Sequence, residues 1–291
     1  MNRRNFIKTS SVVLTGTVMF PGCGMGKSNE LKFGWVTDIH YALAKPRENK
    51  YYTESLTKLK EAIDLYRMSD LDFVIELGDF VDENKIPVFE KSLQYLRSVE
   101  AEFCKYEGDR YHALGNHDMN SLSKSDFLNE IENTGISNEH SFYSFQKNGF
   151  KCIVLDACYR SDGVVYDKGN FEWTDTIIPD AELKWLKEEL NKSNSPVLIF
   201  VHQLLDGKGD LYVNNSARVR EILEESGKVF AVFQGHQHKG QYNKINNIHY
   251  ITEKALVDGS GAENNSYCIV TVKGTDQIVI DGYRRMEDMK L

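Results

Sequence analysis

One pattern recurs five times in this chain and constrains its fold more than any other feature. A short run of apolar and β-branched residues ends, and a side chain able to bind a metal ion follows. The five runs span residues 31–37, 71–77, 111–114, 196–201 and 229–233. Runs of this length and composition predict buried β-strands. The polar side chains that follow them are Asp38 and His40, Asp79, Asn116 with His117, His202, and His236 with His238.

Helical patterns separate these predicted strands. They span residues 53–67, 88–103, 125–132, 180–190 and 216–224, and several begin with Asp or Ser, which favour the N-cap position. Strands that alternate with helices predict a largely parallel sheet with helices packed on it. Ligands of such sheets bind beyond the carboxyl ends of the strands. We therefore expect the five motifs to converge on one site, with Gly78, Gly115 and Gly235 in sharp turns around it.

The chemistry of these side chains points to metal ions. The candidate ligands are Asp38, His40, Asp79, Asn116, His202, His236 and His238. Oxygen and imidazole ligands without sulfur suit divalent or trivalent ions such as Mn, Fe or Zn. Seven ligands are too many for one tetrahedral ion with an open position, whereas two ions that share a carboxylate use them economically. Each motif alone has a structural explanation, such as a helix cap or a core histidine, but five in this order indicate a dinuclear hydrolase.

The motifs resemble the signature of the calcineurin-like metallophosphoesterase superfamily. They read Asp-Ile-His at 38–40, Gly-Asp-Phe-Val-Asp at 78–82, Gly-Asn-His-Asp at 115–118, a single His202, and Gly-His-Gln-His at 235–238. The resemblance implies an α/β fold, a four-layer α/β/β/α sandwich of two mixed β-sheets flanked by helices. It also implies a first metal on Asp38, His40, Asp79 and His238, and a second on Asp79, Asn116, His202 and His236.

The same resemblance implies the reaction. It is the hydrolysis of phosphate esters or phosphoanhydrides by a metal-bridging hydroxide, with His117 as the proton donor and Asp82 as the acid that orients it. Residues 50–56 and 240–252 are similar to the manganese-dependent ADP-ribose/CDP-alcohol diphosphatases, although those proteins carry Gln where this chain has His40. The expected substrate is a small phosphorylated molecule such as a nucleotide derivative.

Besides the predicted metal site, a long predicted loop between Asp156 and Pro179 is a candidate for substrate contacts. Its larger side chains are Tyr159, Arg160, Tyr166, Phe171 and Trp173. Long loops over an active site are often functional. Two interpretations stay open: the aromatic rings stack on a base while Arg160 contacts a phosphate, or these residues only anchor the loop.

Composition limits the alternatives. The formal net charge of −8, from 35 basic and 43 acidic residues, argues against a nucleic acid as partner, because such binding depends on Lys and Arg. A DNA-repair nuclease is therefore disfavoured. The remaining alternative is a non-catalytic binding lipoprotein that retains the metallophosphoesterase fold. That alternative predicts the loss of a ligand or of the proton donor, and none is lost.

The first residues have the layout of an export signal. Basic residues precede an apolar run at 10–20, so we assign residues 1–30 to a signal and tether and residues 31–291 to one catalytic domain. Residues 2–8 resemble a twin-arginine signal. Residues 20–23 resemble a lipoprotein cleavage site, which implies lipidation of Cys23 and anchoring to a membrane. A generic secretory signal is the alternative. We expect a protein of the bacterial periplasm or a membrane-anchored lipoprotein.

Four cysteines lie beyond the predicted signal. Cys152 and Cys268 occur in apolar runs typical of strands, which predicts small buried core residues. Export would also permit a disulfide between Cys152 and Cys158, which sequence cannot decide.

Overall fold

The computed structural model describes residues 30–291, so the predicted signal and Cys23 lie outside the described residues. One sheet contains β1 (Glu30–Val36), β2 (Phe73–Leu77), β3 (Arg110–Ala113), β10 (Ser266–Lys273), β11 (Gln277–Arg284) and β12 (Met289–Lys290). The other contains β4 (Tyr143–Lys147), β5 (Phe150–Val154), β6 (Val197–Val201), β7 (Val229–Gln234), β8 (Lys239–Ile245) and β9 (Ile248–Lys254). The helices are α1 (Ser55–Arg67), α2 (Phe89–Phe103), α3 (Lys124–Leu128), α4 (Asp180–Lys192) and α5 (Ser216–Ser226).

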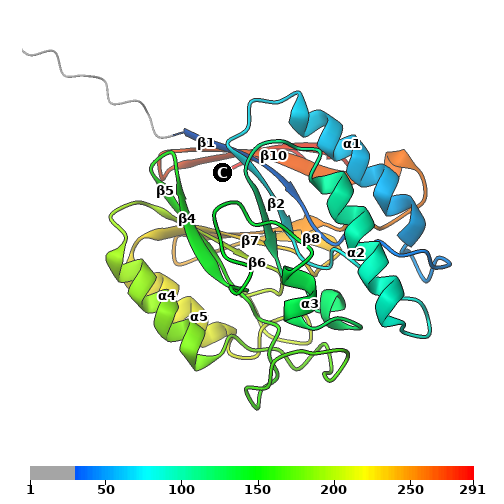
Figure 1. The fold of residues 1–291 in the computed structure, drawn as a ribbon. Coiled ribbons are helices and arrows are strands. Elements are labelled where there is room, and N and C mark those ends of the chain that lie inside the picture. Colours follow the sequence, from blue (N-terminus) through cyan, green and yellow to red (C-terminus); the bar gives the residue numbers. More distant parts are fainter. Residues whose placement is uncertain (1–29) are drawn as a thin grey trace, which may run out of the picture.

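Both sheets are mixed. The first has the strand order β12-β11-β10-β1-β2-β3 and the second β4-β5-β6-β7-β9-β8. Parallel pairing joins β1, β2 and β3 in the first sheet and β5, β6, β7 and β9 in the second. Helices α1 and α2 cover the outer face of the first sheet, and α4 and α5 cover the second (Figure 1). The expected four-layer α/β/β/α sandwich is confirmed.

Three apolar layers hold the sandwich together. The layer between the two sheets is rich in aromatic rings, where Phe33 stacks on Phe73 and meets Phe200 and Phe233 edge to face. A second layer joins α1 and α2 to the first sheet, and a third joins α4 and α5 to the second sheet. The central strands are therefore buried on both faces, which explains why they read as continuous apolar runs.

A helix forms in each predicted range, but the one expected at residues 125–132 spans only Lys124–Leu128, and the expected caps do not all occur. Helix α3 is capped by Ser123 and not by Ser125, through a capping box with Asp126. Asp180 and Ser216, expected as N-caps, are instead the first residues of α4 and α5, and neither helix has a side-chain cap. An acidic residue inside the first turn still favours a helix, because it interacts with the positive end of the helix dipole.

The cysteines of the described chain are all free. Cys152, Cys158 and Cys268 are buried, and no disulfide joins Cys152 to Cys158 in the part of the chain that the structure describes. Within residues 30–291, no helix has both the length and the apolar composition needed to cross a membrane.

Candidate metal centre

The seven candidate ligands lie where the carboxyl ends of five strands meet. Those after β1, β2 and β3 come from the first sheet, and those after β6 and β7 come from the second. Three groups have ligand atoms within 4.8 Å of one another: Asp38, His40 and His238; Asp79, His202 and His236; and His40, Asp79 and His117. Asp79 and His40 each belong to two groups, so the groups form one continuous cluster at the junction of the two sheets.

Sharp turns after the strands aim these side chains into the cluster. Asp38, His40, Asp79 and His236 all have positive φ, between 46° and 67°. Residues other than glycine rarely adopt this region, and each instance costs about 1–3 kcal/mol. Tight packing of the loops maintains the turns. A Cβ atom on Gly115 would lie 2.1 Å from the backbone nitrogen of Asp79, and one on Gly235 would lie 2.1 Å from Oγ1 of Thr37.

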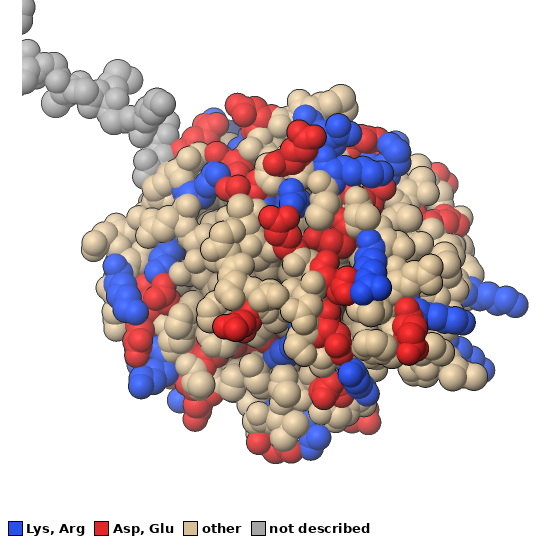
Figure 2. All heavy atoms as spheres, viewed as in Figure 1, with Lys and Arg blue, Asp and Glu red and all other residues tan. Residues whose placement is uncertain are grey.

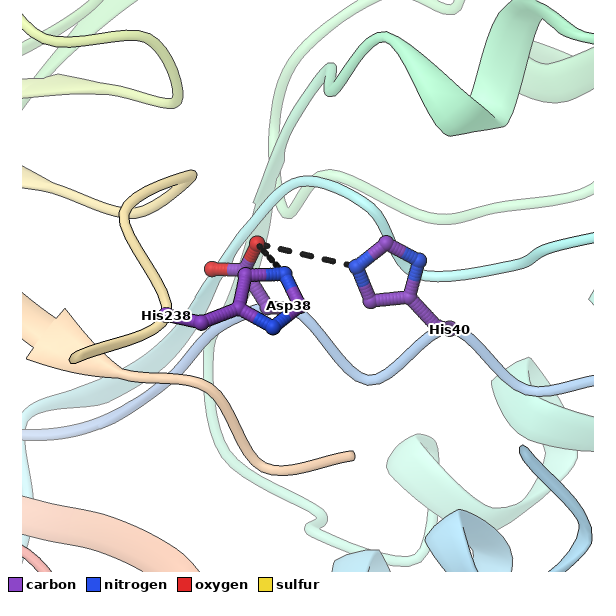
Figure 3. A group of neighbouring side chains, drawn as sticks. All are labelled: Asp38, His40 and His238. Atoms are coloured by element: carbon purple, nitrogen blue, oxygen red, sulfur yellow. Dashed lines mark ion pairs between the residues drawn. The ribbon is translucent and has the colours of Figure 1, made fainter. Parts of the chain in front are cut away.

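The first group is built around Asp38 (Figure 3). Its Oδ1 lies 3.4 Å from Nε2 of His238 and 3.7 Å from Nε2 of His40. Its Oδ2 accepts hydrogen bonds from the hydroxyl of Thr37 and the backbone N–H of His236. Burial alone would raise the pKa of Asp38, but its contacts with His238 and His40 outweigh burial and hold that pKa well below the ordinary value. The carboxylate is therefore in its ligating form.

The second group contains Asp79, His202 and His236. Oδ2 of Asp79 lies 3.2 Å from Nε2 of His202 and 3.5 Å from Nε2 of His40, which places this carboxylate between the two groups. Nδ1 of His202 lies 2.6 Å from the carbonyl of Leu77, and its Nε2 lies 3.1 Å from Nδ1 of His236. Burial lowers the pKa of His202, but Asp79 outweighs burial and raises it to about 10. Burial, assisted by the charge of His202, lowers the pKa of His236 to about 3.

Unpaired buried atoms show that this cluster fits metal ions. Among the described residues, four buried atoms here have no hydrogen-bond partner: Asp38 Oδ1, His40 Nε2, Asn116 Oδ1 and His236 Nε2. An unpaired buried polar atom costs about 1–3 kcal/mol. All four are potential metal-ligand atoms on predicted ligands, and the set contains oxygen and nitrogen but no sulfur. Divalent cations such as Mn²⁺ prefer such donors. The residues therefore fit a centre of two ions that share Asp79.

Asp82 links the cluster to His117. Oδ2 of Asp82 lies 3.0 Å from Nδ1 of His40 and 3.3 Å from Nδ1 of His117. Burial would raise the pKa of Asp82, but His117 outweighs burial and holds that pKa well below its ordinary value. The side chain of His117 is 28% exposed, unlike that of His40, which is fully buried. His117 lines a cavity of about 830 Å³ together with Asn116 and members of the cluster.

Two carboxylates that support the cluster were not assigned this role from the sequence. Asp258 accepts a hydrogen bond from Nδ1 of His238 at 2.9 Å. It follows β9 in an irregular segment, and no sequence spacing connects it to His238. Asp118 belongs to the predicted 115–118 motif, and its oxygens accept the backbone N–H groups of Asp79, Val81 and Gly115. It ties the loop after β2 to the loop after β3, and does not cap a helix.

In the loop between Asp156 and Pro179, each of the two interpretations left open by the sequence fits some of the residues. Trp173 lines the cavity and is 43% exposed, with its ring 5.8 Å from that of His236. The other residues anchor the loop. Tyr166 stacks on Phe171 at 3.8 Å, and the ammonium of Lys124 lies over the ring of Tyr159. Arg160 forms an ion pair with Asp162 on the same loop.

Comparison with known sequences identifies related proteins. The family model described as calcineurin-like phosphoesterase matches residues 31–240. Two curated relatives are named manganese-dependent ADP-ribose/CDP-alcohol diphosphatase. The Oryza sativa protein is 24% identical, and the match covers 78% of this chain and 83% of that protein. The Xenopus tropicalis protein is also 24% identical, and the match covers 89% of this chain and 93% of that protein.

Solved structures share the fold. A dimetal phosphatase from Danio rerio superposes with a TM-score of 0.77 at 21% sequence identity, covering 89% of this chain and 98% of that one. A purple acid phosphatase from yellow lupin superposes with a TM-score of 0.56 at 13% identity, covering 90% of this chain and 53% of that one. At these identities the similarity establishes the architecture.

Proposed function

The chain belongs to the calcineurin-like phosphoesterase family, and from that premise we propose that it is a dinuclear metal-dependent hydrolase of phosphate esters or phosphoanhydrides. One observation carries the proposal: the ligand groups form one cluster in which Asp79 lies within 3.5 Å of both His40 and His202, and four buried ligand atoms of this cluster and the adjoining Asn116 have no hydrogen-bond partner within residues 30–291. Asp38, His40, Asp79 and His238 would hold one ion, and Asp79, Asn116, His202 and His236 the other. When bound, two such ions neutralise phosphate charge and activate a water molecule as the nucleophile.

The protein's own contribution to the chemical step is proton transfer and orientation. His117 is positioned to give a proton to the leaving oxygen, because its ring reaches the cavity while Asp82 contacts its Nδ1. Asp82 also contacts His40, so one carboxylate orients both a ligand and the proton donor. General acid catalysis of this kind typically contributes about 10²–10⁴-fold to the rate.

We assign the substrate to the nucleoside diphosphate derivatives. The curated relatives are named for ADP-ribose and CDP-alcohols. The cavity offers the matching chemistry: Lys50 and Lys239 supply positive charge for a diphosphate, and the exposed ring of Trp173 supplies a stacking surface for a base. Stacking of a base on an aromatic side chain is worth about 1–3 kcal/mol.

The decisive experiment measures metal content and substrate preference together. Protein purified without chelator is assayed for bound metal, then for hydrolysis of p-nitrophenyl phosphate, bis-p-nitrophenyl phosphate and ADP-ribose with added Mn²⁺. We expect close to two ions per chain and the highest kcat/KM for ADP-ribose. Protein that binds no metal and hydrolyses none of the three would instead support the alternative of a non-catalytic binding lipoprotein.

Trp173 allows a separate test of substrate class. Trp173→Ala should raise KM for ADP-ribose by about 5–150-fold, the equivalent of losing about 1–3 kcal/mol of stacking, and leave KM for p-nitrophenyl phosphate nearly unchanged. Trp185→Ala is the control, because Trp185 lies on α4 and packs against Phe142. An equal KM for ADP-ribose in Trp173→Ala and wild type would exclude base stacking at this position.

A nucleic-acid substrate is disfavoured by charge. On the face shown in Figure 2, Lys and Arg side chains are interspersed with Asp and Glu and form no continuous basic band. Binding to a nucleic-acid backbone depends on such a band.

We retain the prediction that residues 1–30 are an export signal and tether for a catalytic domain of residues 31–291. Fractionation of cells that produce the full chain and a Cys23→Ala variant tests it. Release of only the variant from membranes would support lipid anchoring, and a cytoplasmic location for both would exclude export.

A further inference from the structure

A buried lysine lies behind the candidate metal centre. Lys58, on α1, is 2% exposed. Its Nζ lies 2.6 Å from the carbonyl oxygen of Gly259, 3.0 Å from that of Asp258 and 3.1 Å from that of Leu256. The carbonyls of Val257 and Asn264 lie at 3.5 Å. Lysine is almost never buried without partners, and here all the hydrogen-bond acceptors are backbone carbonyls.

The segment that surrounds Lys58 also holds the first ligand group. The backbone N–H groups of Leu256 and Val257 donate to the carbonyls of Thr37 and Asp38, each at 3.1 Å. Asp258, in the same segment, accepts the hydrogen bond from Nδ1 of His238. Residues 256–259 thus present their carbonyls to Lys58 on one side, and contact Asp38 and His238 on the other.

We propose that Lys58 is a positioning residue for the first metal ion, acting through Asp258 on His238. The ammonium fixes residues 256–259, and the carboxylate of Asp258 then holds the proton of His238 on Nδ1 and leaves Nε2 free to bind metal. Nε2 of His238 lies 3.4 Å from Oδ1 of Asp38, the other ligand that this segment contacts. The inference rests on the proposed metal-dependent function. Carboxylates that orient a ligating histidine typically change metal affinity by about 10–100-fold.

The charge of Lys58 is essential to this role. Five carbonyls point toward one position, but that of Val257 also accepts the backbone N–H of Tyr51 and that of Asn264 also accepts Nε–H of Arg285. An apolar side chain there would leave the carbonyls of Leu256, Asp258 and Gly259 without a donor among the described residues, at a cost of about 1–3 kcal/mol for each. Burial lowers the pKa of Lys58 to about 8, so at pH 7 most of the amine keeps the proton that these bonds need. The carbonyls together form a ring of oxygens that a small free monovalent cation could also occupy.

The test compares Mn²⁺ binding to matched variants of the full chain by isothermal titration calorimetry. Lys58→Met keeps the length of the side chain but removes its charge, and should weaken one of the two Mn²⁺ sites by about 10–100-fold. Lys60→Met is the control, because Lys60 lies on the same helix, is exposed, and pairs only with Asp64 within the described chain. Asp258→Asn should reproduce the loss, and the double variant should lose little more because both act on His238.

Wild-type affinity in Lys58→Met would overturn the inference, even if the melting temperature fell, because that pattern shows a purely structural lysine. If Lys58→Met does not fold, the inference is tested with Asp258→Asn instead. Unchanged Mn²⁺ affinity in that variant would also overturn the inference. Wild-type protein that binds no Mn²⁺ would contradict the proposed function itself, a result distinct from both.

Cation rescue provides an independent measurement. Lys58→Ala leaves the position of Nζ, between the carbonyl oxygens, free for a small cation. Ammonium chloride should therefore restore the Mn²⁺ affinity of this variant. Tetramethylammonium chloride at the same concentration should not, because it cannot donate hydrogen bonds. Equal affinity in the two salts would contradict a role for the bound ammonium.

Discussion

The carboxylate of Asp79 links the two ligand groups. Oδ2 lies within 3.5 Å of histidines from each group, and Oδ1 accepts the backbone N–H of His117. Asp79→Asn should therefore lose both metal ions, because the amide is a weaker ligand and removes a charge shared by the two sites. Metal content after gel filtration measures this, with Asp64→Asn as the control, because Asp64 lies on α1 with a side chain that is 45% exposed. Retention of two ions by Asp79→Asn would exclude the bridging role.

His117 should affect chemistry without affecting metal binding. His117→Asn removes the proposed proton donor but none of the seven ligands, so metal content should stay at the wild-type value. We expect kcat to fall about 10²–10⁴-fold for an alkyl phosphate, whose leaving oxygen needs a proton. The loss should be much smaller for p-nitrophenyl phosphate, because its leaving group is stable as an anion. An equal loss with both substrates would argue against proton donation.

Residues that follow a strand were predictable, and residues that support them from elsewhere were not. His40 and His202 follow apolar runs, and parallel strands bring their carboxyl ends together, so sequence alone places them at one edge. Asp258 and Lys58 lie outside any such pattern. Their roles depend on how the segment after β9 folds against α1, which is a tertiary contact between residues 200 positions apart.

The strands contribute to the candidate metal centre through the sharp turns at their carboxyl ends, which set the position of the ligands. The loop after β3 passes so close to the loop after β2 that a Cβ on Gly115 would lie 2.3 Å from Oδ1 of Asp79. Gly115→Ala should displace Asp79 and lower both metal content and activity at least about 10-fold, although Gly115 is not itself a ligand. Gly135→Ala is the control, because its Cβ would meet no atom within 4 Å and only its positive φ is unfavourable. Wild-type metal content in Gly115→Ala would show that the loops can separate.

The elements themselves were predictable where one apolar pattern dominates. The central strands β1, β2, β6 and β7 are nearly or fully buried, and their sequences are correspondingly apolar. Strand β8 is mostly exposed at the edge of its sheet, so it lacks the apolar run that would identify it. The pairing of two sheets into one sandwich is likewise absent from local sequence, because it depends on which aromatic faces meet.

At the scale of the molecule, the candidate centre joins the two sheets. Asp38, His40, Asp79 and Asn116 follow strands of the first sheet, whereas His202, His236 and His238 follow strands of the second. Without metal, the same junction contains buried anions and unpaired ligand atoms. Metal ions should therefore stabilise the packing of one sheet on the other as well as supply chemistry.

This coupling predicts that metal removal lowers the melting temperature. A ligand that binds only the folded state at 100 times its Kd stabilises that state by about 2.7 kcal/mol. For a domain of this size, about 1 kcal/mol shifts the melting temperature by about 2–4 °C, so each ion at that saturation should raise it by roughly 5–10 °C. Calorimetry of wild-type protein in EDTA and in Mn²⁺ measures the shift. Asp79→Asn should melt at one temperature in both solutions, since it lacks the shared ligand. Equal melting temperatures of the wild-type protein in EDTA and in Mn²⁺ would contradict this prediction. That result would show that metal ions do not stabilise the packing of the two sheets, even though ligand atoms at their junction are unpaired.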